Sequence, residues 1–201
     1  MIYVVGGIKG GSGKTTVATN LAVALALEGR DVLLVDADDQ ETATDFSAWR
    51  NERTEGRTGY TSVQLTGQAA REELRRLASK FEDVVIDTGG RDTTSQRAAL
   101  TVADLYLVPF NPRSFDVWTL EKVTRLIQEI QTVNPDLRSY AFLNRADPRG
   151  SDNDEAADAL NIGPDDGEDA DAGDIELGDE QPGSVEHEND DGVNDALIAA
   201  E

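Results

Sequence analysis

A glycine- and lysine-rich run near the start of the chain has the composition of a phosphate-binding loop. It reads KGGSGKTT over residues 9–16, follows the apolar run 2–5 and precedes a helical pattern that extends to Leu27. Glycines let backbone N–H groups close around a phosphate chain, and the start of the next helix adds partial positive charge. We therefore expect Lys14 to lie along the β- and γ-phosphates of a nucleotide and the Thr15 hydroxyl to ligate Mg²⁺.

The loop departs from the usual phosphate-loop spacing. That spacing requires glycine at position 8, where this chain has Ile8, and the loop carries an additional lysine, Lys9. One nucleotide held by Lys14 and a metal ion does not need a second ammonium, so we interpret Lys9 as serving a second active site. The alternative is a glycine turn with incidental lysines. It is disfavoured because strand, loop and helix occur in the order that the motif requires.

Two further apolar runs end in aspartates. The run 32–35 leads into Asp36 and Asp38, and the run 84–86 leads into Asp87, a threonine and two glycines. Carboxylates at the carboxyl end of a parallel strand face the ligand crevice of an α/β sheet. Asp87 is therefore predicted to lie near the Mg²⁺ shell, followed by a turn that can sense the γ-phosphate.

Together these motifs resemble those of the ParA/MinD class of deviant Walker ATPases, and most closely the small ParA-type partition ATPases. The resemblance covers roughly three quarters of the chain. It implies an ATP-sandwiched homodimer in which Lys9 crosses the interface to the partner's nucleotide. It matches Asp38 to the residue that orients the attacking water and Asp36 to the one near the metal and first switch. Asp39 replaces the family's proline, and capping of a helix near Thr42 stays open as an alternative for both aspartates.

The resemblance also implies the remaining site residues. Asn144 ends an apolar run that looks like the family's adenine-side motif, and its amide can both donate to and accept from adenine. The expected catalytic residues are Lys9, Lys14 and Asp38, and the expected Mg²⁺ residues are Thr15, Asp36 and Asp87. Residues expected to bind ATP are Gly10, Gly11, Ser12, Gly13, Lys14, Thr15, Thr16 and Asn144.

The order of the apolar segments predicts an α/β fold. Continuous apolar runs at 2–5, 32–35 and 84–86, and a further strand segment at 104–109, are typical of strands buried in a parallel sheet, and helical patterns lie between them. We expect a doubly wound, mainly parallel sheet with flanking helices and the first strand central. The resemblance implies a P-loop NTPase fold of the SIMIBI type. Residues 42–53 are predicted to form a helix in which Trp49 packs into the core.

Acidic residues are concentrated at the end of the chain. The formal net charge is −22, yet residues 151–201 hold 19 acidic residues and no Lys or Arg, whereas residues 1–150 hold 21 acidic and 18 basic residues. We therefore predict an ATPase domain over 1–150, without the family's terminal elements, and a disordered acidic tail over 151–201. The tail is interpreted either as an arm for a basic partner or, preferably, as an altered reading frame.

Composition narrows the function. The absence of cysteine excludes disulfides and iron–sulfur clusters, and no apolar run or signal segment indicates a membrane, so a cytoplasmic protein is expected.

The resemblance implies a slow ATP hydrolase that acts as a switch in plasmid or chromosome partition with a ParB-type activator. Nonspecific DNA is a weaker candidate partner, because the charge is unfavourable for phosphate. The alternatives are a nucleotide-gated interaction module, a MinD-like positioning ATPase and an impaired product.

Overall fold

The computed structural model describes residues 1–67, 70–114, 117–146, 152–160 and 173–174. One sheet organises them, with strand order β3-β2-β4-β1-β5-β6-β7. All pairings are parallel except that of β7 with β6. The strands are β1 (Ile2–Val5), β2 (Val32–Ala37), β3 (Thr61–Gln64), β4 (Asp83–Thr88), β5 (Leu105–Phe110), β6 (Arg138–Leu143) and β7 (Gly173–Asp174). The predicted doubly wound sheet with a central first strand is confirmed.

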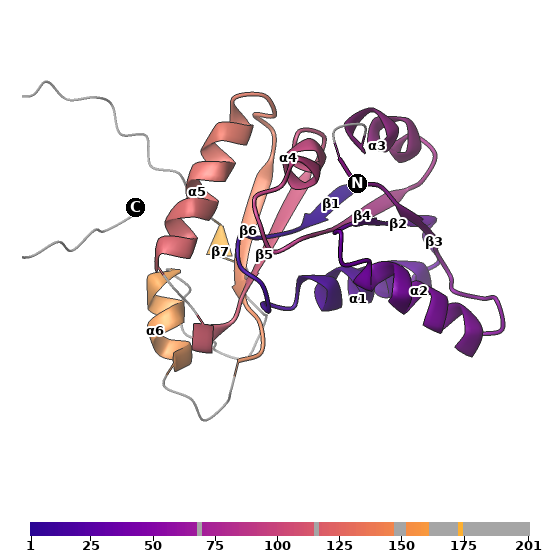
Figure 1. Ribbon diagram of the computed structural model, residues 1–201, viewed down its shortest axis with the longest axis horizontal. Coiled ribbons are helices and arrows are strands. Elements are labelled where there is room, and N and C mark those ends of the chain that lie inside the picture. Colours follow the sequence, from indigo (N-terminus) through magenta and orange to yellow (C-terminus); the bar gives the residue numbers. More distant parts are fainter. Residues whose placement is uncertain (68–69, 115–116, 147–151, 161–172, 175–201) are drawn as a thin grey trace, which may run out of the picture.

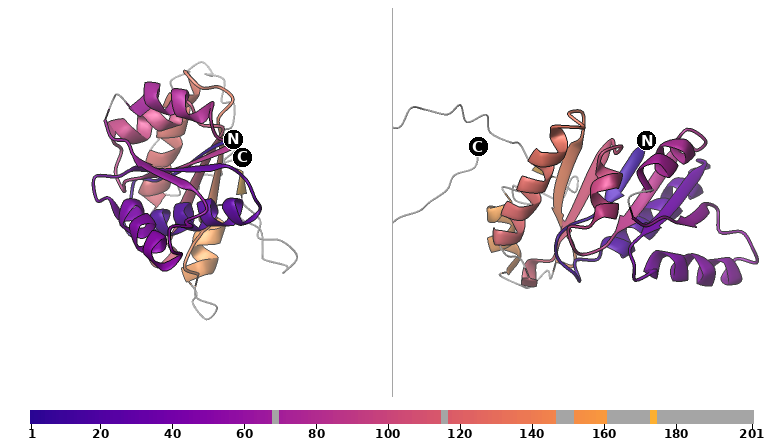
Figure 2. Two further views of the ribbon diagram at one scale, coloured as in Figure 1. Left: turned by 90° about the vertical axis from the view of Figure 1, so that its right-hand side faces the viewer. Right: turned by 45° about the horizontal axis from the view of Figure 1, so that its top comes forward.

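Helices cover both faces of the sheet, with α3 and α4 above it and α1 and α2 below it in Figure 1. Figure 2 shows the same layers from two other directions. The helices are α1 (Lys14–Leu27), α2 (Thr42–Arg53), α3 (Ala70–Ala78), α4 (Thr94–Leu100), the 3₁₀ helix η1 (Pro112–Ser114), α5 (Val117–Gln131) and α6 (Asp152–Ala159). The helix predicted over 42–53 therefore has the bounds expected from the sequence.

Successive residues of the central strands pack into two separate cores. Val4 and Leu33 belong to the core beneath α3, α4 and α5, whereas their neighbours Val5 and Leu34 belong to the core shared with α1 and α2. Side chains alternate between the two faces of a strand, so a strand covered on both faces needs an apolar residue at every position. This requirement explains the continuous apolar runs.

The prediction that Trp49 packs into the core is wrong. Its side chain is 54% exposed rather than packed in the core. The Arg53 guanidinium lies 4.9 Å from the centre of its ring, and the Phe46 ring lies 6.3 Å away. The helical pattern placed Phe46 and Trp49 on one face, but α2 is buried mainly through Ala43 and Ser47.

Helix α6 lies within the range that the sequence assigned to the tail. It packs against η1 and β6, with Ala156 buried and Leu160 against the main core. The remainder of 151–201, apart from 173–174, lies outside the described residues, as does the predicted disorder there. In the described ranges, no helix is long and apolar enough to span a membrane.

Candidate functional site

The loop between β1 and α1 has the backbone of a phosphate-binding loop. Gly11 and Gly13 take φ values of 83° and 92°, in the left-handed region that only glycine adopts without strain. Gly13 is the residue that precedes α1, so the first N–H groups of that helix open onto the loop. A Cβ at Gly13 would also overlap the Asn144 amide. Local geometry therefore favours glycine at positions 11 and 13.

Lys14 is the first residue of α1, and its side chain is folded into the loop. Its ammonium group donates a 2.9 Å hydrogen bond to the carbonyl oxygen of Lys9, and the residue is only 6% exposed. Burial lowers the pKa of Lys14, while the negative charges of Asp87 and Asp38 oppose that shift. The amine thus lies inside the loop close to two carboxylates.

An open groove of about 710 Å³ runs along the carboxyl ends of the strands, which is large enough for a nucleotide. Its walls come from the loop, from the turns after β2 and β4, and from the end of β6. The residues that line it are Gly10, Gly11, Gly13, Lys14, Thr15, Thr16, Asp38, Asp39, Gln40, Thr42, Gly89, Gly90, Arg91, Thr93 and Arg145. The groove therefore brings together most of the residues predicted to bind phosphate, and also Asp38.

Asp36 is occupied by hydrogen bonds to its own chain. One carboxylate oxygen accepts both the N–H and the hydroxyl of Thr44, each at 2.8 Å, and the other accepts the N–H of Asp38 at 3.1 Å. The side chain is fully buried. These bonds cap the first turn of α2 and fix the turn that carries Asp38. The capping alternative thus accounts for the two bonds from Thr44, and a role of Asp36 in binding metal stays a prediction.

Asp87 has the opposite environment. It is fully buried, and no hydrogen bond from the described residues reaches either carboxylate oxygen; the Thr15 hydroxyl lies beside it but outside hydrogen-bond geometry. Burial raises the pKa of Asp87 to about 7; Thr15 and Lys14 oppose this shift, and the charges of Asp36 and Asp38 add to it. A buried carboxylate without donors is unfavourable unless a cation is supplied.

The turn after β4 lies directly against the phosphate loop. A Cβ at Gly90 would come within 2.9 Å of the backbone of Gly10, and a Cβ at Gly89 would come within 3.1 Å of an Asp38 carboxylate oxygen. The Oδ1 atom of Asp38 also accepts the N–H of Gln40 at 3.2 Å. The two glycines therefore allow the loop, Asp38 and this turn to meet at one place in the groove.

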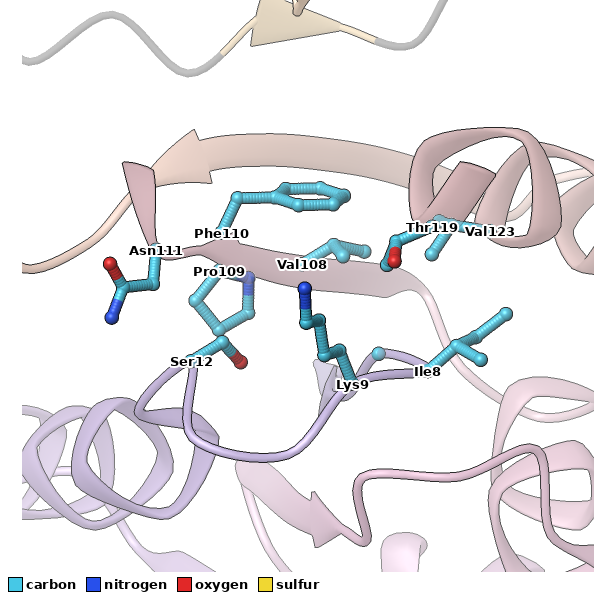
Figure 3. A pocket seen from close by; sticks show the side chains of 10 residues that line it. Ile8, Lys9, Ser12, Val108, Pro109, Phe110, Asn111, Thr119 and Val123 are labelled. Atoms are coloured by element: carbon cyan, nitrogen blue, oxygen red, sulfur yellow. The ribbon is translucent and has the colours of Figure 1, made fainter. Parts of the chain in front are cut away.

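Lys9 and Ser12 lie on the other side of the loop, around a cavity of about 20 Å³. In Figure 3 the Lys9 side chain extends from the loop towards Val108 and Pro109 of β5. Lys9 is thus not among the groove-lining residues, in contrast to Lys14. This position fits an amine that does not serve the nucleotide site of its own chain.

Two residues that follow β6 donate hydrogen bonds to the backbone of the phosphate loop. Asn144 donates from Nδ2 to the Ser12 carbonyl at 2.8 Å, and Arg145 donates from Nη1 to the Gly11 carbonyl at 3.1 Å. The Asn144 amide nitrogen thus contacts the loop, and adenine recognition stays a prediction. Sequence reasoning missed Arg145, which lines the groove. Its position directly after Asn144, at the carboxyl end of a strand, was the available signal.

The chain matches the model of the CobQ/CobB/MinD/ParA nucleotide binding domain over residues 3–165. It is 38% identical to maintenance of carboxysome distribution protein A from Gloeobacter kilaueensis over 143 residues, which cover 70% of this chain and 61% of that protein. It is 31% identical to the chromosome partitioning protein ParA of Myxococcus xanthus, over 67% of this chain and 61% of that protein. The chain thus spans about three fifths of the length of these two relatives.

Solved structures share the fold. Cobyrinic acid a,c-diamide synthase from Mycobacterium smegmatis, solved with a bound ATP analog and magnesium, superposes with a TM-score of 0.70 at 23% identity, covering 81% of this chain and 82% of that one. At this level of identity the likeness concerns the arrangement of helices and strands.

Proposed function

The chain belongs to the CobQ/CobB/MinD/ParA nucleotide-binding domain family, and on that premise we propose that it is a Mg²⁺-dependent ATP hydrolase working as a ParA-type switch. The observation that carries the proposal is the position of the Asp87 carboxylate beside the phosphate loop. A buried carboxylate without hydrogen bonds lies beside Thr15 and Lys14, next to a groove of nucleotide size. MgATP would place its phosphates against the backbone N–H groups of this loop and its metal ion near this carboxylate.

The residues present fit Mg²⁺. In the described part of the chain, no three acidic, His or Cys side chains form a metal site by themselves. Mg²⁺ bound with a nucleotide needs no such set, because phosphates and water supply most of its ligands. The Thr15 hydroxyl would ligate the ion directly, and Asp87 would hold its outer shell. When bound, the ion neutralises charge on the β- and γ-phosphates.

Asp38 is proposed to orient the attacking water. Its carboxylate faces Gly89 in the groove, and the hydrogen bond from the Asp38 N–H to Asp36 fixes the turn that carries it. Phosphoryl transfer depends on positioning and electrostatics, so a carboxylate held near the γ-phosphate end of the loop suits this role.

Lys9 is proposed to act in a homodimer. Its side chain points towards β5 rather than into the groove of its own subunit. In a face-to-face, ATP-sandwiched dimer it would swing out to the partner's nucleotide and neutralise transition-state charge there. A ParB-type activator and nonspecific DNA are further proposed partners.

The cargo is proposed to be either a DNA molecule or a protein assembly. The relative at 38% identity is named for carboxysome distribution, and the one at 31% for chromosome partitioning. The first of these favours a positioning ATPase for a protein assembly as the second candidate function. Both candidates use the same groove and the same chemistry.

The test combines ATP hydrolysis with a thermal melt, with and without MgATP. Saturation at about a hundred times Kd should add roughly 2.7 kcal/mol to the free energy of unfolding. Lys14→Ala should abolish this gain, whereas Lys80→Ala, an exposed lysine outside the groove, should retain it. Asp38→Ala should lose turnover and keep the ATP-dependent dimer. A melt of the wild-type chain that is indifferent to MgATP would refute the proposal.

A further inference from the structure

Gln96 is a fully buried amide in α4 that the predicted site does not include. Burying an amide without hydrogen bonds is costly, so its partners define what it does. Four groups from four different segments surround it. They are the carbonyl oxygens of Gly7 and Arg91, the hydroxyl of Thr88 and the phenol of Tyr106.

The orientation of the amide follows from these neighbours. Two of them, Gly7 and Arg91, offer only a carbonyl oxygen, each 3.2 Å away, so the amide nitrogen must face them. The amide oxygen then accepts the hydrogen bond of the Tyr106 phenol at 3.2 Å. In this orientation every polar atom of the Gln96 side chain has a partner.

The two carbonyl groups belong to two separate segments of the proposed nucleotide site. Gly7 opens the phosphate loop, and Arg91 lines the groove in the turn after β4. The side chain of Gln96 thus hydrogen-bonds to the backbone of both the loop and the turn. The backbone N–H of Gln96 donates a hydrogen bond to the hydroxyl oxygen of Thr93 at 3.1 Å, and Thr93 also lines the groove.

Close packing leaves little room for independent movement of the two parts. The Thr88 hydroxyl donates to the Val5 carbonyl at 3.1 Å, which ties the end of β4 to the end of β1. A Cβ at Gly6 would come within 2.7 Å of both Thr88 and the Tyr106 ring. At Gly90 the turn meets the backbone of the loop, as described above. A shift of the turn is therefore transmitted to the loop.

We propose that Gln96 is a positioning residue that couples the turn 89–91 to the phosphate loop and holds both in the geometry that hydrolysis requires. The inference rests on the proposed function for the reaction itself. Neither Lys14 nor Thr15 is among the hydrogen-bond partners of Gln96, so nucleotide affinity should survive its loss. Turnover should not, because phosphoryl transfer is sensitive to displacements of about 1 Å.

A purely structural role makes a different prediction. A buried amide that only fills space can be replaced by a side chain of similar volume, with a loss of stability and unchanged turnover per folded molecule. The split between kcat and nucleotide affinity separates the two roles.

The experiment compares Gln96→Met with Ser139→Ala, which removes a buried hydroxyl of the same sheet outside this network. For Gln96→Met we expect kcat to fall about 10- to 100-fold while the Kd for ATP stays within about threefold. Tyr106→Phe should lower kcat less, and the double variant should be no worse than Gln96→Met alone. Ser139→Ala should leave kcat unchanged. Unchanged kcat in Gln96→Met, or an equal loss in Ser139→Ala, would overturn the proposal.

Hydrogen exchange without nucleotide provides a second readout that does not depend on hydrolysis. Gln96→Met should speed exchange in both the loop 7–13 and the turn 89–93, and Ser139→Ala should change neither. Faster exchange in only one segment would refute the coupling. If the wild-type chain hydrolysed no ATP, the proposed function would fall, and exchange would still decide whether Gln96 couples the two segments.

Discussion

The ends of two neighbouring strands carry the same residue in opposite environments. Asp36 of β2 and Asp87 of β4 are partners in the parallel register, and both are fully buried. Asp36 accepts three hydrogen bonds, whereas Asp87 accepts none from the described residues. The difference shows that a carboxylate at a strand end serves the fold when donors surround it. Without donors, as at Asp87, its burial comes at a cost to stability.

The largest loss of stability should come from replacing Asp36, the carboxylate that accepts three hydrogen bonds. Asp36→Ala leaves three donors without their acceptor, so we expect the free energy of unfolding to fall by about 3–5 kcal/mol. The midpoint of a thermal melt should fall by roughly 10 °C. The exposed neighbour supplies the control, and Asp39→Ala should change the midpoint little. A small loss in Asp36→Ala would mean that its hydrogen bonds are not what separates it from Asp87.

Replacing Asp87, the carboxylate without hydrogen bonds from the described residues, should lower the rate of ATP hydrolysis rather than the stability. Asp87→Asn keeps the shape and removes the charge that is proposed to hold the metal, so we expect ATP hydrolysis to fall about 100-fold, equivalent to about 2.7 kcal/mol. Without nucleotide and metal the variant should be at least as stable as the wild type at about pH 8. Steady-state hydrolysis and a melt in chelator test the two statements. A destabilised variant with normal turnover would reverse the comparison.

The titration of Asp87 sharpens the contrast. Its folded pKa of about 7 lies above the value of about 4 in an unfolded chain, so the folded state binds the extra proton between these values. The free energy of unfolding should therefore fall as the pH rises, by about 1.4 kcal/mol from about pH 6 to about pH 8. Urea melts in chelator should show this slope in the wild type and a shallower one in Asp87→Asn. Parallel slopes would contradict it.

The smallest effect concerns a single donor of Asp36. Thr44→Val removes the hydroxyl and keeps the N–H, so Asp36 retains two of its three hydrogen bonds. The expected loss is about 1 kcal/mol, measured by urea denaturation. Thr132→Val, which removes an exposed hydroxyl that donates to a main-chain carbonyl, is the control and should lose less. Equal losses would show that the hydrogen bond to Asp36 has no special weight.

Much of the fold could be predicted because burial on both faces leaves a direct trace in the sequence. The runs at 2–5 and 32–35 are apolar at every position, and the strand order then places their ends at one groove. The phosphate loop was equally accessible, because Gly11 and Gly13 occupy left-handed conformations that other residues avoid. Local geometry and residue type determine each other at such positions.

The rest could not be predicted because it depends on partners that are distant in the sequence. Asp36 and Asp87 each follow an apolar run, and the donors of Asp38 and Thr44 that distinguish them do not show in that run. Gln96 is a polar residue in a short helix, which from sequence alone indicates exposure, yet Tyr106 and the loop bury it. Helix α6 has an acidic composition and still packs through Ala156.

The pairing of the first strand has a consequence for how the protein is made. Strand β1 pairs with β4 and β5, which follow it by about eighty and one hundred residues. As a ribosome releases the chain, the loop emerges well before the strands on both sides of β1. Contacts of such long range form slowly, and nucleotide cannot assist them before β5 is available. The phosphate loop is therefore synthesised before the strands that flank β1 and, we expect, takes its shape only after they have emerged.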